Sequence, residues 1–188
     1  MEDHQRQQEA RMRRDELEHA LRAAADITGE RTMFVIGSQS ILGSYREWEL
    51  PAAATVSREV DIGFFNDPGG HKADLIEGAI GEESDFDQTY GIYVDGVDEQ
   101  TAALPNGWWE RLVEVTGANT AGARGLCLEP HDCALSKLAA GREKDHAFVA
   151  ALLDAGLINA DVLAERAETM DVPPVALRRM LDWLSRWR

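Results

Sequence analysis

The stretch SREVDIGFF, residues 57–65, carries two carboxylates inside a segment that is otherwise largely apolar. Glu59 and Asp61 are two positions apart, and residues two apart on a β-strand point to the same face of the sheet. Val60 and Ile62 alternate with them and give the segment an apolar opposite face. The pattern therefore predicts a strand that carries two like charges side by side, which is unfavourable unless a cation lies between them.

A carboxylate pair at this spacing suits Mg²⁺, a hard cation that takes oxygen ligands and often bridges to substrate phosphates. The alternative is that the pair lies on a solvated face of the strand. A third carboxylate from a neighbouring strand would complete a site for metal ions or supply a base. Asp95, at the end of YGIYVD (residues 90–95), is the candidate, and Asp98 is the alternative. The remaining possibility is that the aspartate only belongs to a turn.

The upstream stretch FVIGSQSILGSY, residues 34–45, reads as a short strand that runs into Gly37 and then into a helix. Ser38 or Ser40 would cap that helix. Such a turn gathers backbone N–H groups, a hydroxyl and a helix N-terminus at one point, which favours an anion. A Gly-Ser turn is usually only a turn, but its combination with a downstream carboxylate pair is more specific.

Together, FVIGSQSIL and SREVDIGFF resemble the signature of the nucleotidyltransferase superfamily, a Gly-Ser loop followed by a strand with paired carboxylates. LEPHDCALSKLAAGREKD, residues 128–145, resembles the lysine-bearing helix of AbiEii-type toxins and related uncharacterised nucleotidyltransferase-like proteins. The resemblance covers roughly residues 30–155. One departure is Glu59, where the superfamily usually has aspartate.

This resemblance implies a role for each matching position. Nucleotide binding falls to Gly37, Ser38, Ser40, Lys137 and Arg142. The metal ligands would be Glu59 and Asp61, with Asp95 as the third carboxylate, and the catalytic residues would be Asp95, Lys137 and Asp145. Asp95 would ligate a second metal or take the proton of the acceptor hydroxyl.

The implied activity is metal-dependent transfer of a nucleoside monophosphate from an NTP onto a hydroxyl, with Mg²⁺ as the cofactor and Mn²⁺ as the alternative. The resemblance implies tRNA or a protein as the acceptor, and a toxin role with an antitoxin protein as partner. Two alternatives stay open. Glu59 favours a catalytically inactive interaction module with the same fold, and the acidic charge favours an antibiotic-type enzyme with a cationic small-molecule acceptor.

The chain has 188 residues, of which 44% are hydrophobic, and a formal net charge of −15. This charge disfavours a protein that simply coats nucleic acid. The arginines gather near the two ends, and they either lie on solvated helix faces or form one basic patch: Arg11, Arg13, Arg14, Arg22, Arg178, Arg179, Arg186 and Arg188. No apolar run suits a membrane span or a secretory signal, and the two cysteines suit a reducing compartment. We therefore expect a cytoplasmic protein without a membrane partner.

The order of elements predicts an α+β (α/β-like) fold: a small mixed sheet of nucleotidyltransferase type with flanking helices and a C-terminal helical subdomain. We expect an N-terminal helix in residues 1–29, with its periodic part over 8–26, a core in 30–130 and the helical subdomain in 131–188. Within the helical part, Asn159 is a predicted helix cap and Pro174 a predicted helix start.

Overall fold

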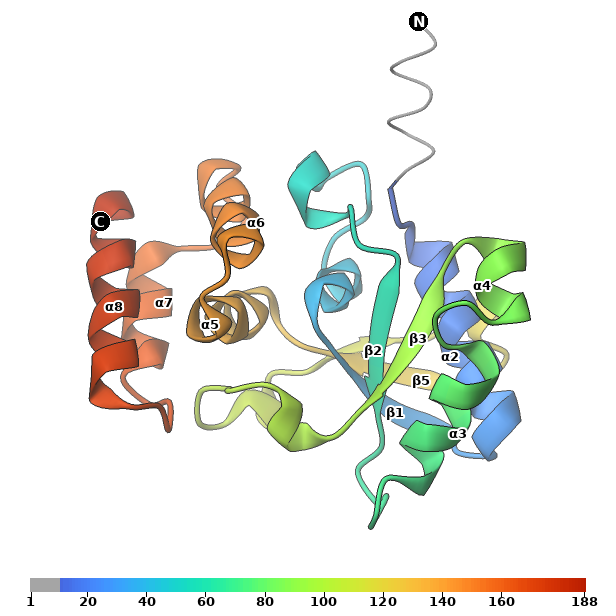
Figure 1. Ribbon diagram of the computed structural model, residues 1–188. Helices are drawn as coiled ribbons and strands as arrows, with labels where there is room; N and C mark the ends of the chain where they lie inside the picture. Colours follow the sequence, from blue (N-terminus) through green and yellow to red (C-terminus); the bar gives the residue numbers. More distant parts are fainter. Residues whose placement is uncertain (1–10) are drawn as a thin grey trace, which may run out of the picture.

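The computed structural model describes residues 11–188 and contains one five-stranded mixed sheet (Figure 1). The strands are β1 (Thr32–Ile36), β2 (Glu59–Gly63), β3 (Tyr93–Val97), β4 (Val113–Val115) and β5 (Arg124–Cys127). Their order across the sheet is β3-β2-β1-β5-β4. The central strand β1 runs antiparallel to β2 and parallel to β5, while β2 and β3 are parallel to each other.

The helices fall into two groups (Figure 1). The first group, α2 (Arg14–Thr28), α3 (His71–Ile80) and α4 (Asp85–Tyr90), lies beside the sheet. The second group, α5 (Pro130–Ala140), α6 (Glu143–Asp154), α7 (Ala160–Ala167) and α8 (Pro174–Leu184), extends away from the sheet, with α8 outermost. This arrangement confirms the predicted α+β class. None of the helices in the described part of the chain has the length and apolar character needed to cross a membrane.

The N-terminal helix starts later than predicted. Within the predicted span 8–26, residues 8–10 lie outside the described part of the chain, and α2 begins only at Arg14. Two contacts hold the preceding backbone out of the helix: the Met12 N–H donates to Thr55 O, and the Arg13 N–H donates to the Glu16 carboxylate. The helix ends as predicted at Gly29, which has a φ of 73°.

The local signals in the C-terminal part are confirmed. The Asn159 side chain accepts hydrogen bonds from two backbone N–H groups at the start of α7, and Pro174 is the first residue of α8. The sequence allows one or two helices up to Gly156, and the structure has two, α5 and α6, because Gly141, with a φ of 69°, ends α5. The short helix α4 was not predicted.

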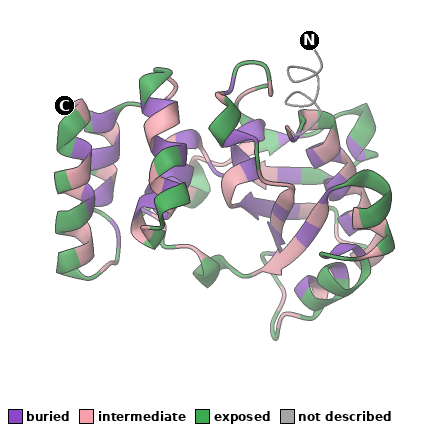
Figure 2. Cartoon of the chain, turned by 45° about the horizontal axis from the view of Figure 1, so that its top comes forward, coloured by how far each residue is buried: buried purple, intermediate pink, exposed green. Residues whose placement is uncertain are grey.

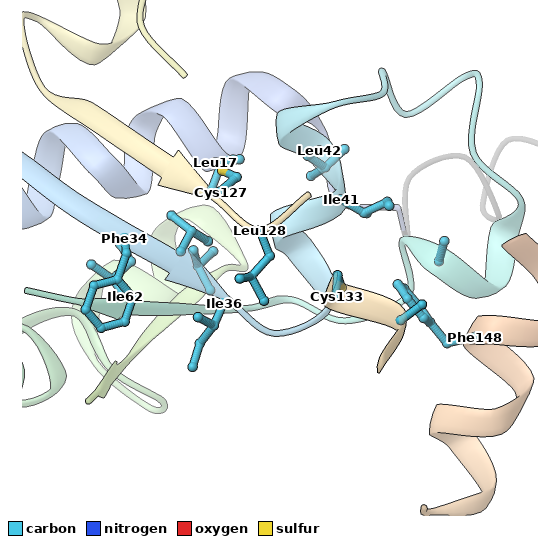
Figure 3. Close-up of a cluster of buried hydrophobic side chains, with 14 of the residues drawn as sticks. Leu17, Phe34, Ile36, Ile41, Leu42, Ile62, Cys127, Leu128, Cys133 and Phe148 are labelled. Carbon is cyan, nitrogen blue, oxygen red and sulfur yellow. The ribbon is translucent and has the colours of Figure 1, made fainter. Parts of the chain in front are cut away.

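A continuous hydrophobic core joins the sheet to both helix groups. Figure 3 shows part of it, from Leu17 of α2 across Phe34 and Ile62 of the sheet to Cys133 and Phe148 in the helical part. Buried residues line the strands and the facing sides of the helices, whereas the outer side of α8 is mostly exposed (Figure 2). The core therefore holds the carboxylate strand and the C-terminal helices in one fixed relation.

Candidate active site

Three carboxylates meet on one side of the sheet. The β2–β3 register places Asp61 opposite Asp95, and Glu59 lies two residues before Asp61 on β2. One carboxylate oxygen from each of the three residues lies within 4.8 Å of the other two. Val60 and Ile62 are fully buried on the opposite face of the strand, as the alternation predicted.

The structure brings Asp95, and not Asp98, to the carboxylate pair. Asp98 is exposed, and its side chain accepts a hydrogen bond of 2.6 Å from the Gln100 N–H at the start of the short helix η3 (Glu99–Thr101). Asp98 therefore has a local role in the turn after β3.

The Gly37 loop lies directly against Asp61. Ile36, the last residue of β1, pairs with Asp61, and Gly37 follows with a φ of 71° and a ψ of −171°, a conformation largely restricted to glycine. A Cβ atom at Gly37 would lie 1.8 Å from Asp61 Oδ2. The glycine thus gives the backbone a close approach to the carboxylates, which brings the predicted phosphate loop and the metal ligands together.

The helix predicted after this loop is a short 3₁₀ helix, η1 (Ser38–Gly43), and its cap is Gly37 rather than Ser38 or Ser40. The Ser40 side chain is fully buried and donates a hydrogen bond of 2.8 Å to Gly37 O. The buried Cys133 thiol donates to the same carbonyl oxygen over 3.3 Å. Ser40 therefore holds the loop from behind, whereas Ser38 lies in the wall of the cleft described below.

The electrostatics of the carboxylates fit a bound cation. Burial, followed by the charge of Glu59, raises the pKa of Asp61 to about 7. Burial and the charge of Glu59 also raise the pKa of Asp95. Without a cation, crowding therefore opposes full ionisation of the cluster. Three oxygen donors held this close are the ligand type that Mg²⁺ or Mn²⁺ requires, so the residues fit a divalent metal ion.

The raised pKa of Asp61 predicts how metal affinity depends on pH. A cation needs the ionised carboxylate, so the apparent Mg²⁺ affinity should rise with pH up to about 7 and level off above that value. Below pH 7 the affinity should change by up to about tenfold per pH unit. The folded state holds the Asp61 proton to a higher pH than the unfolded state, so the free energy of unfolding of the metal-free protein should fall as pH rises from about 4 to 7. Calorimetric titration with Mg²⁺ checks the affinity, and urea denaturation across this pH range checks the stability. Asp61→Asn should remove the contribution of Asp61 to the pH dependence of the free energy of unfolding. A metal affinity that is flat between pH 5 and 7 would contradict the assignment.

Tyr93 supports Glu59, the residue at which the chain departs from the superfamily pattern. The Tyr93 hydroxyl donates a hydrogen bond of 3.2 Å to Glu59 Oε2 across the β2–β3 pair. Burial and the charge of Glu59 raise the pKa of Tyr93 to about 12, so the phenol remains a donor. Glutamate has one rotatable bond more than aspartate, and this hydrogen bond restricts where its longer side chain places the carboxylate.

The substitution Tyr93→Phe should therefore weaken Mg²⁺ binding by about tenfold, because loss of a partner that orients a metal ligand commonly costs this much or more. Isothermal titration calorimetry with Mg²⁺ or Mn²⁺ measures the change. Tyr90→Phe is the matched control, since the Tyr90 side chain is half exposed and lies on α4. Equal metal affinities in the two variants would show that Tyr93 does not position Glu59.

Two cations face the carboxylates from the helical side. Lys137, on α5, is largely buried, and its Nζ lies 3.9 Å from Asp145 Oδ1. Its charge also acts on Asp61 and lowers the pKa that burial raises. Arg142 binds Asp145 through two hydrogen bonds, from Nε over 2.6 Å and from Nη2 over 3.2 Å, while its own side chain stays more than half exposed.

Asp145 is the residue that orients both cations. It lies at the start of α6 and is only 2% exposed. Burial alone would raise the pKa of Asp145, but the hydrogen bond from Arg142 and the charge of Lys137 outweigh it, and the pKa lies below its usual value. The ionised Asp145 carboxylate therefore anchors Lys137 and Arg142 in the cleft that also holds Glu59 and Asp61.

These groups line one cleft of about 930 Å³, which is large enough for a nucleotide. The β-sheet side contributes Gly37, Ser38, Glu59 and Asp61, and the helical side contributes Lys137, Arg142, Lys144 and Asp145. The predicted phosphate loop, metal pair and lysine helix therefore face one another. Two predicted residues lie outside the lining: Asp95, which adjoins the carboxylate pair, and Ser40, which is buried behind the loop.

Sequence reasoning missed three further walls of the cleft. The first is formed by Ala53, Ala54 and Val56 in the connection between β1 and β2. The other two are the segment Thr101–Ala103 after β3 and the segment 171–176 that leads from α7 into α8. A backbone bridge between Pro105 and Met170 joins the regions that carry these two walls. Their residues are mostly small or apolar and carry no motif, so only the tertiary structure reveals their place.

A mixed sheet that presents three carboxylates to a lysine and an arginine across a nucleotide-sized cleft is typical of proteins that carry out metal-assisted chemistry on phosphates. Residues 15–181 match the family described as "Nucleotidyltransferase of unknown function (DUF6036)", and the chain belongs to this family. The predicted superfamily is thereby confirmed, while the AbiEii-type subgroup stays a prediction. Neither the curated proteins nor the solved structures contain a match to the chain.

Proposed function

We propose that this protein is a metal-dependent nucleotidyltransferase that moves a nucleoside monophosphate from an NTP onto an acceptor hydroxyl. The observation that carries the proposal is the cluster of Glu59, Asp61 and Asp95 beside the Gly37 loop, opposite Lys137 and Arg142. Membership of a nucleotidyltransferase family supports the same reaction class. A divalent cation held by the carboxylates would neutralise the charge of the phosphates.

The chain's own residues supply the rest of the chemistry. Lys137 and Arg142 would hold the triphosphate and stabilise the charge that develops on the leaving pyrophosphate. The acceptor oxygen bonds to the α-phosphorus, and the bond from that phosphorus to the bridging oxygen of pyrophosphate breaks. Asp95 would take the hydroxyl proton, a role that its raised pKa favours. The cleft walls would align acceptor and donor, which is a large part of catalysis in such reactions.

The acceptor and the biological role rest on sequence resemblance. The likeness of residues 128–145 to AbiEii-type toxins supports tRNA or a protein as acceptor, and a toxin neutralised by an antitoxin protein. The structure adds one supporting feature, since α5 and α6 present the lysine, the arginine and the anchoring aspartate of this stretch to the cleft.

Calorimetric titration with each NTP, with and without Mg²⁺, tests the proposal. Wild-type protein should bind at least one NTP in the presence of Mg²⁺, and Asp61→Asn should weaken this binding by 100-fold or more, about 2.7 kcal/mol. Asp98→Asn is the matched control, because it makes the same chemical change outside the carboxylate cluster. Asp61→Asn removes a charge from a crowded site, so the metal-free variant should be no less stable than wild type.

Radiolabelled α-phosphate transferred to an acceptor would then establish the reaction itself. The absence of binding to any NTP, in folded wild-type protein at millimolar Mg²⁺, would overturn the proposal. In that case the fold would serve as an interaction module, the alternative that Glu59 favours.

A further inference from the structure

A second depression, which we call the arginine groove, lies between α6 and α8. It has a volume of about 650 Å³ and is lined by His146 of α6 and by residues along α8 and its C-terminal extension, notably Arg178, Arg179, Trp183 and Arg186. The arginines of α2 do not contribute to it, because α2 lies at the opposite side of the molecule (Figure 1). The two chain ends therefore do not form one basic patch, and the C-terminal arginines form a site of their own.

The three arginines of the groove are available to a ligand. All three are exposed, and none takes part in the ion pairs found within residues 11–188. This is unexpected in a chain with 34 acidic and 19 basic residues, where most cations could find a carboxylate. Asp182 is the one acidic residue in the lining. The groove is therefore a local positive site on an acidic protein. The negative charge on the rest of the protein would repel a polyanion and so direct it to the groove.

The aromatic rings at the groove already contact one another and an arginine. The Trp183 ring stacks on His146 at a centroid distance of 5.3 Å and packs against Trp187 at 4.5 Å. The Arg186 guanidinium lies 6.0 Å from the centre of the Trp183 ring. The groove thus offers guanidinium groups rather than a free ring for base stacking, and its chemistry matches phosphate more than nucleobases.

The groove adjoins the cleft that holds the carboxylates. Arg179 Nη2 lies 2.9 Å from the position that a Cβ on Gly141 would occupy, and Gly141 immediately precedes Arg142 of the cleft. Ala176, one turn before Arg179 on α8, lines the cleft itself. From Arg178 to Arg186 the helix rises by about 12 Å. Positive charge therefore continues from the cleft along α8.

We infer that the arginine groove binds the phosphodiester backbone of a single-stranded nucleic-acid acceptor, whose terminal hydroxyl enters the cleft. The inference rests on the proposed nucleotidyl transfer. A nucleic-acid strand supplies in one molecule the hydroxyl that the cleft needs and the regularly spaced phosphates that the groove fits. An acidic peptide could offer repeated carboxylates to the groove, but its chain ends in an amine and a carboxylate and supplies no terminal hydroxyl for the cleft.

Fluorescence anisotropy with a short labelled single-stranded RNA, titrated with the full chain at several salt concentrations, tests this inference. Arg178→Gln/Arg186→Gln should weaken binding by tenfold or more and reduce the salt slope by about 1.4, at ~0.7 per lost phosphate contact on a single strand. Asp182→Asn should strengthen binding, because it removes the carboxylate of the groove. Arg31 is an exposed arginine directly before β1, and Arg31→Gln removes one positive charge away from the groove, so this variant should bind like wild type.

Nucleotide binding on the same variants separates this inference from the proposed function. If Mg²⁺-dependent NTP binding is intact in the double variant and only RNA binding falls, the groove is the acceptor site. If NTP binding holds but RNA binding is absent in wild type, or equal in the double variant and Arg31→Gln, the inference is wrong and the proposed function stands. A labelled polyglutamate peptide serves as the competitor. If this peptide binds the groove more tightly than RNA does, the inference is wrong and the groove fits a protein partner instead.

Discussion

Gly37→Ala is expected to abolish Mg²⁺-dependent NTP binding and to lower the free energy of unfolding by about 3 kcal/mol. The φ of 71° and ψ of −171° at this position strain any residue with a side chain, at a cost of about 1–3 kcal/mol. The added methyl group would also occupy the space of Asp61 Oδ2, which lies 1.8 Å from the Cβ position. The carboxylate would have to move away from Glu59 and Asp95, and the metal site would lose its geometry.

Urea denaturation and NTP calorimetry on the same sample check both parts of this prediction. Gly156→Ala is the matched control: Gly156 has a similar φ of 68°, but nothing lies within 4 Å of its Cβ position. It should lose about 1 kcal/mol from the backbone conformation alone and keep nucleotide binding. If Gly37→Ala bound Mg²⁺ and NTP as well as Gly156→Ala does, the close approach of the loop to Asp61 would have no functional part.

The second large effect is expected at Asp132, which does not line the cleft. This residue is fully buried at the start of α5. It accepts hydrogen bonds from Arg111 at 2.8 and 3.2 Å and from Arg166 at 2.9 Å. Asp132→Asn leaves two partly buried guanidinium groups without their shared anion, and breaking a buried pair commonly costs 3–5 kcal/mol. We expect about 3 kcal/mol, since Arg166 keeps its contact with Glu129.

Chemical denaturation measures this loss, and Glu114→Gln is the matched control. Glu114 pairs with Arg124 at 2.6 Å, but both side chains are about half exposed, so solvent screens the pair and its loss should change stability only slightly. Similar values for the two variants would mean that water already screens the Asp132 network. A large loss at Asp132 with intact NTP binding would identify it as a structural anchor of the helical part.

Much of the site was accessible from the sequence because its signals are local. The alternation in residues 57–65 fixes which face the carboxylates occupy, and a glycine after a short apolar strand indicates a sharp turn. The resemblance to the superfamily rests on these two features and on the lysine-bearing helix, whereas the sheet class followed from the order of elements. The domain boundaries and the catalytic assignments stay predictions.

The remaining features depend on contacts between distant residues, which a single sequence does not encode in a readable way. The sequence offered Asp95 as the candidate and Asp98 as the alternative, and only the β2–β3 register places Asp95 beside Asp61. The hydrogen bond from Tyr93 to Glu59 depends on the same register. The short helix α4 buries no residue, so it leaves no hydrophobic period. The arginine groove could not be predicted either. The sequence shows its arginines, but only the fold shows that they lie apart from the arginines of α2.

The connection between β5 and α5 ties the rotational setting of the lysine helix to the sheet. Only Leu128 and Glu129 separate the two elements, and the Leu128 N–H still donates to Val35 O as an extension of the β1–β5 ladder. Each residue advances an α-helix by about 100° around its axis. One residue inserted into this connection would turn Lys137 away from the carboxylates while leaving every residue of the site in the sequence. The length of this two-residue link is therefore as important to the candidate active site as the groups that would touch the nucleotide.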